Sequence, residues 1–214
     1  FMPKPKFGEA GSGMHIHQSV FRGQKNVFFD ENKADGLSSE MESYIAGIIS
    51  HAAAMTAVTN PLVNSYKRLV PGHEAPVYVA WSKSNRSPLI RIPSRRGIGT
   101  RMELRSPDCA CNPYLALTVS MKAGLMGMKE GLKAPEPISD NIYELNEEQR
   151  IRRNVASLPG NLGEALAAYQ KDPFIRETLG EHIYNRFLAA KKLEWDIYSQ
   201  QVHEWELQKY LWVF

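Results

Sequence analysis

Apolar and polar residues alternate along several short stretches of the 214-residue sequence. An alternation with a period of two is typical of a β-strand that buries one face, because successive side chains point to opposite sides of the sheet. The pattern predicts strands over 14–21, 27–29, 76–82, 88–93 and 100–105. The first two flank a turn at 22–26 and form a candidate hairpin.

Helical spacing of apolar residues predicts helices over 39–59, 113–129 and, in two or three pieces, from 161 onward. Capping signals mark where they begin: a Ser-x-x-Glu box at 39–42, Asn-Pro at 112–113 and an Asn-x-x-Glu pair at 161–164. The last region contains a long amphipathic helix. Its predicted apolar side carries Ile183, Phe187, Ala190 and Ile197.

Strands with interspersed helices, followed by helices only, are typical of an α+β fold. The segments 1–13, 64–75 and 131–160 show no clear period and contain Pro or Gly, so we predict loops there. We expect a sheet-bearing portion at 1–130, a connection at 131–160 and a helical tail at 161–214.

The strand predicted at 100–105 carries Arg101, Glu103 and Arg105 on one face. A carboxylate between two arginines is usually a salt-bridge partner. In a polar cavity, the same three side chains would suit a site that handles anions and a cation together, because the carboxylate can bind Mg²⁺ or Mn²⁺.

The strand predicted at 14–21 places His15, His17 and Ser19 on one face, directly after a Gly-Ser-Gly sequence at 11–13. A His-x-His pair favours a metal or phosphate site, although two polar residues on a half-exposed strand would look the same. Glycine lets backbone amides approach an anion closely. We expect the two polar faces to form two walls of one cavity.

Charge is unevenly distributed along the chain. Residues 64–106 hold nine basic and two acidic residues, a local excess of +7, whereas the whole chain carries only +3. Seven of the nine are Arg, which suits bidentate binding of carboxylate and phosphate. These arginines alternate with apolar residues on predicted strands and no nucleic-acid motif accompanies them, so a pocket is favoured over a nucleic-acid groove.

The remaining composition is that of a globular protein without a membrane helix, since no apolar run approaches about 18 residues. There is no signal-peptide pattern, and the start at Phe1 suggests a piece of a larger protein. Cys109 and Cys111 are spaced too tightly for an ordinary disulfide, which favours free thiols in a reducing cytoplasm.

Glu74 lies in a loop bounded by Pro71 and Pro76 and containing Gly72. A surface glutamate on a stiff turn is one interpretation. A general base on a lid over the cavity is the other, because mobile loops commonly carry such groups. Spacing alone does not separate the two.

A series of motifs occurs in one order along essentially the whole chain. They are Phe1-Met2-Pro3-Lys4-Pro5, Gly11-Ser12-Gly13-Met14-His15, Asn60-Pro61, Asn64 to Gly72, Glu74-Ala75-Pro76, Asn85-Arg86-Ser87, Arg91-Ile92-Pro93, Arg101 to Arg105 and Asn112 to Ala116. The series resembles the C-terminal half of a bacterial type I glutamine synthetase, and 64–76 is its most specific part. The short loop at 94–99 resembles the shorter Gram-positive subtype, which is not regulated by adenylylation.

The resemblance implies a curved antiparallel sheet that lines the active site, with helices outside. It also implies ATP-dependent ligation of ammonia to L-glutamate through γ-glutamyl phosphate, with Mg²⁺ or Mn²⁺, in a cytoplasmic dodecamer of two hexameric rings. The helical tail would contact the opposite ring. The family's other metal carboxylates lie upstream of Phe1, so we expect the fragment alone to be inactive.

The resemblance also assigns roles residue by residue. Metal ligands are His15 and Glu103. Nucleotide contacts are His17, Ser19, Arg86, Arg91 and Arg101. Glutamate contacts are Gly11, Arg68, Glu74, Arg86 and Arg105. Glu74 on the flap and the phosphate-facing Arg86 and Arg101 are the catalytic groups.

Three departures from the family pattern concern the site: Ala10 replaces the usual Asn, His73 an aromatic residue, and Cys109 with Cys111 small residues or Pro. They leave open a γ-glutamyl ligase that uses another amine. A second alternative is a non-catalytic module that binds a nitrogen-responsive transcription regulator through the tail at 191–214.

Overall fold

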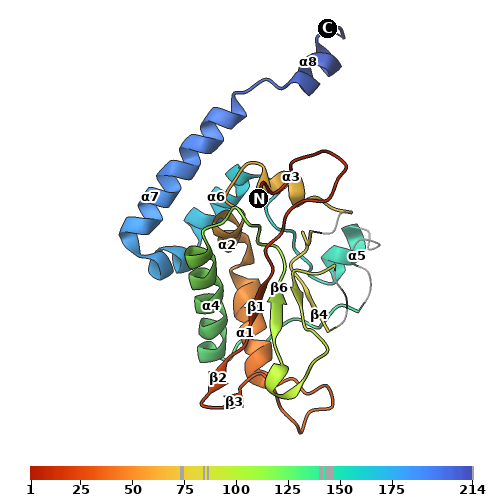
Figure 1. Ribbon diagram of the computed structural model, residues 1–214, viewed down its shortest axis with the longest axis vertical. Helices are drawn as coiled ribbons and strands as arrows, with labels where there is room; N and C mark the ends of the chain where they lie inside the picture. The colour runs from red at the N-terminus through yellow and green to blue at the C-terminus, as the bar shows by residue number, and fades with distance from the viewer. Residues whose placement is uncertain (73–74, 84, 86, 140–141, 143–146, 214) are drawn as a thin grey trace.

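A computed structural model describes residues 1–72, 75–83, 85, 87–139, 142 and 147–213 (Figure 1). It confirms the α+β class. The strands are β1 (Ile16–Gln18), β2 (Phe21–Arg22), β3 (Lys25–Asn26), β4 (Trp81–Ser82), β5 (Ile90–Arg91) and β6 (Met102–Leu104). The helices are α1 (Ser39–Ser50), α2 (Ala52–Thr59), α3 (Ser65–Arg68), α4 (Pro113–Glu130), α5 (Glu147–Arg152), α6 (Leu162–Lys171), α7 (Pro173–Ser199) and α8 (Glu204–Tyr210), with a short 3₁₀ turn η1 (Gly97–Gly99).

The main sheet has the strand order β1-β6-β5-β4. β6 is antiparallel to both β1 and β5, whereas β4 runs parallel to β5, so the expected antiparallel character holds for two of the three pairings. The register places His17 opposite Glu103 and Glu103 opposite Arg91. Because directly paired residues share a face, these three side chains form one row across the sheet.

The strands are shorter than predicted, and the first predicted strand is two separate ones. β1 ends at Gln18, and β2 then pairs with β3 in a hairpin whose turn contains Gly23 in the left-handed region at φ 62°. The hairpin is therefore confirmed, but its strands lie closer together than expected, at the two ends of the turn predicted at 22–26. Glycine adopts this conformation without steric cost, so two residues, 23–24, are enough to connect the strands.

Helices α1 and α4 lie side by side, on one side of the sheet (Figure 1). Glycine makes this close approach possible: a Cβ on Gly47 would lie 2.1 Å from the Ala123 carbonyl oxygen, and one on Gly127 would lie 2.2 Å from that of Ser43. The packed faces bury the chain's core, in which Phe28 and Tyr44 meet edge to edge with ring centroids 5.0 Å apart.

Three predicted boundaries were wrong. The first helix is capped by Ser38, whose Oγ accepts a hydrogen bond from Met41 N at 3.1 Å, and it breaks at His51 into α1 and α2. The loop predicted at 64–75 contains the single turn α3, and the connection at 131–160 contains α5. One or two helical turns are too short to display a helical period in the sequence.

The tail begins as predicted, because Asn161 Oδ1 accepts from Glu164 N at 2.8 Å and caps α6. α7 then kinks at Gly180, where φ is 74°, and leads away from the body toward α8 (Figure 1). Two residues of its predicted apolar side, Ile183 and Ile197, are 42% and 55% exposed. No helix in the described part of the chain is both long and apolar enough to cross a membrane.

Candidate active site

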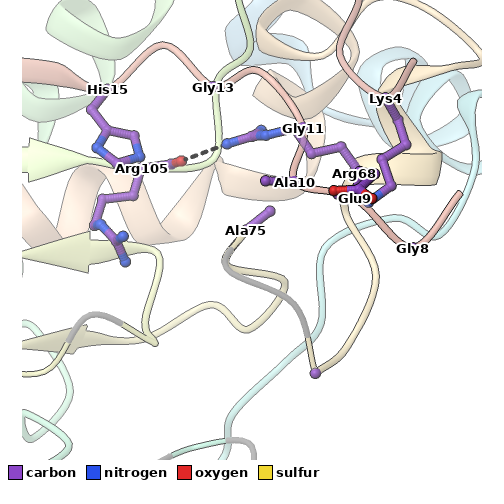
Figure 2. Close-up of a pocket in the computed structure, with 11 residues that line it drawn as sticks. Lys4, Gly8, Glu9, Ala10, Gly11, Gly13, His15, Arg68, Ala75 and Arg105 are labelled. Atoms are coloured by element: carbon purple, nitrogen blue, oxygen red, sulfur yellow. Dashed lines mark hydrogen bonds between the residues drawn. The ribbon is translucent and has the colours of Figure 1, made fainter. Parts of the chain in front are cut away.

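A cavity of about 620 Å³ opens between the N-terminal loop, the end of α3 and the segment that follows β6. Figure 2 shows His15 and Arg105 at one end of it and Lys4 and Glu9 at the other, with Arg68 between them. Most of its lining is polar or glycine. The lining residues are Lys4, Gly8, Glu9, Ala10, Gly11, Gly13, His15, Arg68, Gly72, Ala75 and Arg105.

Glu103 is the centre of the charged groups at the cavity end. Its Oε1 lies 2.8 Å from His15 Nδ1 and 3.8 Å from Arg105 Nε, and its Oε2 accepts from Arg91 Nη1 at 2.9 Å. The carboxylate is only 6% exposed. The two predicted polar faces therefore do meet, and β6 supplies the carboxylate on which basic groups from β5 and the residue before β1 converge.

The surroundings lower the pKa of Glu103 and also the pKa of His15. Burial alone would raise the pKa of Glu103, but the hydrogen bond from Arg91 and the electrostatic interactions with His15 and Arg105 outweigh it, so its pKa lies below the ordinary value. Burial, together with Arg105, lowers the pKa of His15 although Glu103 opposes the shift. A neutral imidazole beside an ionised carboxylate is the protonation state that binds a metal.

The donor atoms suit a divalent cation in kind, since carboxylate oxygen and imidazole nitrogen both bind such ions. His15 Nδ1 and Glu103 Oε1 are 2.8 Å apart, at hydrogen-bonding distance. Among the residues that the structure describes, no group of three or more His, Cys, Asp or Glu side chains could hold such an ion. Within the described residues, the pair could therefore supply no more than two ligands of such a site.

Arg68 and Arg105 are both 7% exposed and line the same cavity. Arg68 Nη1 donates to the Ser106 carbonyl at 2.7 Å, and its Nη2 reaches the Arg105 carbonyl at 3.4 Å. The opposite loop leaves room for this guanidinium only because residue 13 is glycine. A Cβ on Gly13 would lie 2.4 Å from Arg68 Nη2. The side chain is thus held in one orientation from both sides.

His17 and Arg101 form a polar group in which the His17 side chain is more exposed than that of Glu103. Arg101 Nε lies 3.2 Å from His17 Nδ1, and the His17 side chain is 45% exposed. Ser19 does not join them, since its Oγ donates to the Thr100 carbonyl at 3.1 Å. His17 and Arg91 therefore share a row with Glu103, Arg101 contacts His17, and the Ser19 hydroxyl is bound to a backbone carbonyl instead.

Two predicted site residues, Glu74 and Arg86, lie outside the described residues. Gly72 and Ala75, which flank the first of these positions in sequence, both line the cavity. Gly11 also lines it.

Sequence reasoning missed several residues that build the site. Lys4 and Glu9 line the cavity, and Asn60 and Asp108 lie fully buried beneath Arg68. In the sequence Asn60 was a helix-stop signal and Asp108 part of a turn. The only signal for Lys4 was its place in the first motif, 1–5.

Cys109 and Cys111, which follow the same turn, are free thiols as predicted. Cys111 is buried, which raises the pKa of its thiol to about 11.

Comparison with known proteins agrees with this geometry. The sequence profile of "Glutamine synthetase, catalytic domain" matches residues 1–210. Glutamine synthetases of Thermus thermophilus and Staphylococcus aureus (strain MW2) are 56% and 54% identical over 211 residues, which are 99% of this chain and 47% of theirs. The chain thus spans about half the length of the curated relatives it matches.

Two solved structures share the fold. "Apo GmaS without ligand" superposes with a TM-score of 0.84 and "GmaS/ADP complex-Conformation 1" with 0.86, each at 33% identity over 99% of this chain and 47% and 48% of those chains. The chain belongs to the glutamine synthetase catalytic-domain family.

Proposed function

We propose that this chain supplies one part of the active site of an enzyme that ligates ammonia to L-glutamate with ATP and forms L-glutamine through γ-glutamyl phosphate. The observation that carries the proposal is the pairing of Glu103 at 2.8 Å with His15, which lines the cavity together with the buried Arg68 and Arg105. The family relation to glutamine synthetases supports it.

The reaction joins two anions, because a carboxylate attacks the γ-phosphate of ATP. Their repulsion must be offset by positive groups held in place beforehand. In this proposal Arg68 and Arg105 bind the carboxylates of glutamate, and Gly11 contributes a backbone contact. The burial of both guanidinium groups supports the assignment, since a charge pair is stronger away from water.

His15 and Glu103 would hold a divalent cation, Mg²⁺ or Mn²⁺, as two ligands of a set completed by residues outside this chain. When bound, the ion would neutralise phosphate charge. Arg91 and Arg105 keep Glu103 ionised and oriented toward His15, so the ligand pair is prepared before any ion arrives.

His17, Ser19 and Arg91 would contact the nucleotide in the same proposal, and Arg101 would stabilise the transferred phosphoryl group. The position of His17 and Arg101 beside the Glu103 row supports this, as does the relative solved as an ADP complex. Arg86 would contact both phosphate and glutamate. Glu74 would close over glutamate and shield or deprotonate the incoming ammonium, which lets the acyl phosphate meet ammonia before water.

The proposal extends to assembly, as a cytoplasmic dodecamer of two hexameric rings. The exposed apolar side chains of the tail support it, since Leu193, Trp205 and Trp212 are 61%, 63% and 87% exposed. Light scattering of the full-length protein tests this part, and a monomer would contradict it.

The activity test compares a full-length protein containing this chain with the 214-residue chain alone. Glutamine and phosphate are measured with ATP, Mg²⁺, glutamate and ammonium. We expect glutamine from the full-length protein only. Absence of glutamine from the full-length protein refutes the ligase function, and glutamine from the isolated chain refutes the shared site.

A further inference from the structure

A buried polar network lies directly beneath the cavity, and Asn60 is its centre. The Asn60 side chain is 0% exposed. Its Nδ2 donates to the Ser106 carbonyl at 2.8 Å and to Asp108 Oδ2 at 3.0 Å, while its Oδ1 accepts from Thr59 Oγ1 at 2.9 Å. Both amide hydrogens are therefore used, so the side chain has one favourable orientation.

The network ends on the guanidinium of Arg68. The Ser106 carbonyl that accepts from Asn60 also accepts from Arg68 Nη1, at 2.7 Å. Arg68 is the last residue of α3, a helix of four residues. A single turn has little stability of its own, so the orientation of Arg68 depends on contacts from other parts of the chain.

Asp108 holds the same helix through charge and a second hydrogen bond. It is 0% exposed, and its Oδ1 accepts from Ala110 N at 3.0 Å. The Ser65 side chain, at the start of α3, also hydrogen-bonds the carboxylate, which in addition attracts Arg68 electrostatically. The two ends of α3 are thus both drawn toward one buried carboxylate.

We propose that Asn60 and Asp108 are positioning residues for Arg68: they fix the Ser106 carbonyl and the ends of α3 so that the guanidinium faces the substrate cavity in a single orientation. Neither side chain lines the cavity itself. The inference rests on the proposed function in one respect, the binding of a glutamate carboxylate by Arg68. A network that only stabilises the core would not affect that binding.

The first test is kinetic and uses Asp108→Asn in the full-length protein. The variant keeps the volume of the side chain but removes its charge and leaves a donor facing either Asn60 or Ala110. We expect the KM for glutamate to rise about tenfold or more, with the KM for ATP within about twofold of the original. Thr59→Val is the milder second variant, because it removes the hydroxyl that donates to Asn60 Oδ1 and otherwise reaches only the Met55 carbonyl, at 3.2 Å within α2.

Thr56→Val is the matched control. Thr56 is equally buried, and its Oγ1 donates to the Ala52 carbonyl at 2.8 Å within α2, without a link to Arg68. It should lower the melting temperature without changing either KM. If Asp108→Asn and Thr59→Val also lower only the melting temperature, the proposal is overturned.

The second test does not require activity. Nitrogen NMR of the 214-residue chain reports whether a guanidinium rotates slowly, and Arg68→Lys identifies the Arg68 signals. We expect separate Nη signals in the original chain and in Thr56→Val, and averaged signals in Asp108→Asn. Unchanged signals in Asp108→Asn contradict the positioning role. Failure of the ligase activity with the expected NMR result would refute only the function.

Discussion

His15 Nδ1 lies 2.8 Å from Glu103 Oε1, although the two residues come from opposite ends of the sheet-bearing part of the sequence. The antiparallel register of β1 and β6 brings them together. Arg91 occupies the other carboxylate oxygen, so Glu103 cannot turn away from His15 without losing a charge-assisted hydrogen bond. The position of the carboxylate is therefore set by its neighbours.

The first prediction follows from this pair. Glu103→Gln in the full-length protein retains the shape of the side chain but removes the charge that a divalent cation needs. We expect the Mg²⁺ concentration for half-maximal activity to rise about tenfold or more, as is usual when a metal site is weakened. Titration of activity with Mg²⁺ measures it.

His182→Asn is the control, because His182 lies on the exposed part of α7, far from the sheet. It should leave the Mg²⁺ requirement unchanged. A Glu103→Gln variant with the original Mg²⁺ requirement would contradict the assignment of Glu103 as a ligand.

The second prediction contrasts two glycines of the cavity loop. In Gly13→Ala, the new Cβ would meet Arg68 Nη2 at 2.4 Å, which is the end of a flexible side chain. In Gly11→Ala it would meet the Pro3 carbonyl oxygen at 2.3 Å, which is fixed backbone. We expect Gly13→Ala to displace Arg68, and Gly11→Ala to displace the loop and lower stability.

Thermal unfolding and glutamate kinetics separate the two effects. Gly13→Ala should raise the KM for glutamate about tenfold while the melting temperature stays within about 2 °C of the original. Gly11→Ala should lower the melting temperature by several degrees, about 2–4 °C per kcal/mol lost in a chain of this size. Equal melting temperatures in both variants would disprove the distinction.

Part of this site could be predicted from the alternation of side chains along the strands. His15 and Glu103 were placed on polar faces of two strands, and the faces do meet. The pairing partner of β6 could not be derived, because register depends on contacts between segments far apart in sequence. The alternation of side chains does not say what each residue does in a reaction. Those expected roles came from the resemblance to glutamine synthetases.

The network under Arg68 was missed for a physical reason. Asn60 and Asp108 are 48 positions apart, and each has a local explanation, one as a helix stop and the other as a turn residue. Only the folded chain shows that the two buried side chains hydrogen-bond each other, while Asn60 also binds the Ser106 carbonyl and Asp108 also interacts with α3. The single turn α3 was missed likewise, since four residues cannot display a period of 3.6.

The third prediction concerns the thiols. Cys111 is 5% exposed and its pKa is raised to about 11, so it remains protonated below that pH, whereas Cys109 is partly exposed. Because the thiolate is the reactive form, a disulfide reagent at pH 8 should modify Cys109 at least tenfold faster than Cys111. Cys109→Ser should remove the fast phase, and a fast phase that persists would show that Cys111 is accessible.

The last prediction links the tail to the cavity through α3. On α7, Glu194 Oε1 accepts from Val63 N at 3.2 Å, and the Tyr198 ring lies 5.8 Å from Lys67 Nζ. These contacts hold the segment that carries Arg68 in addition to the buried network. Each is worth about 1 kcal/mol or less, so the double variant Glu194→Ala/Tyr198→Ala should loosen α3 without unfolding the chain.

Hydrogen exchange measures this loosening directly. The Leu69 amide donates to the Ser65 carbonyl at 3.1 Å and reports on the only turn of α3. We expect it to exchange about tenfold faster in the double variant, since a loss of about 1.4 kcal/mol in local stability changes the open fraction tenfold. Ile183→Ala, at an exposed position on the same helix, should leave the rate unchanged. An unchanged rate in the double variant would show that α3 is held by the Asn60–Asp108 side alone.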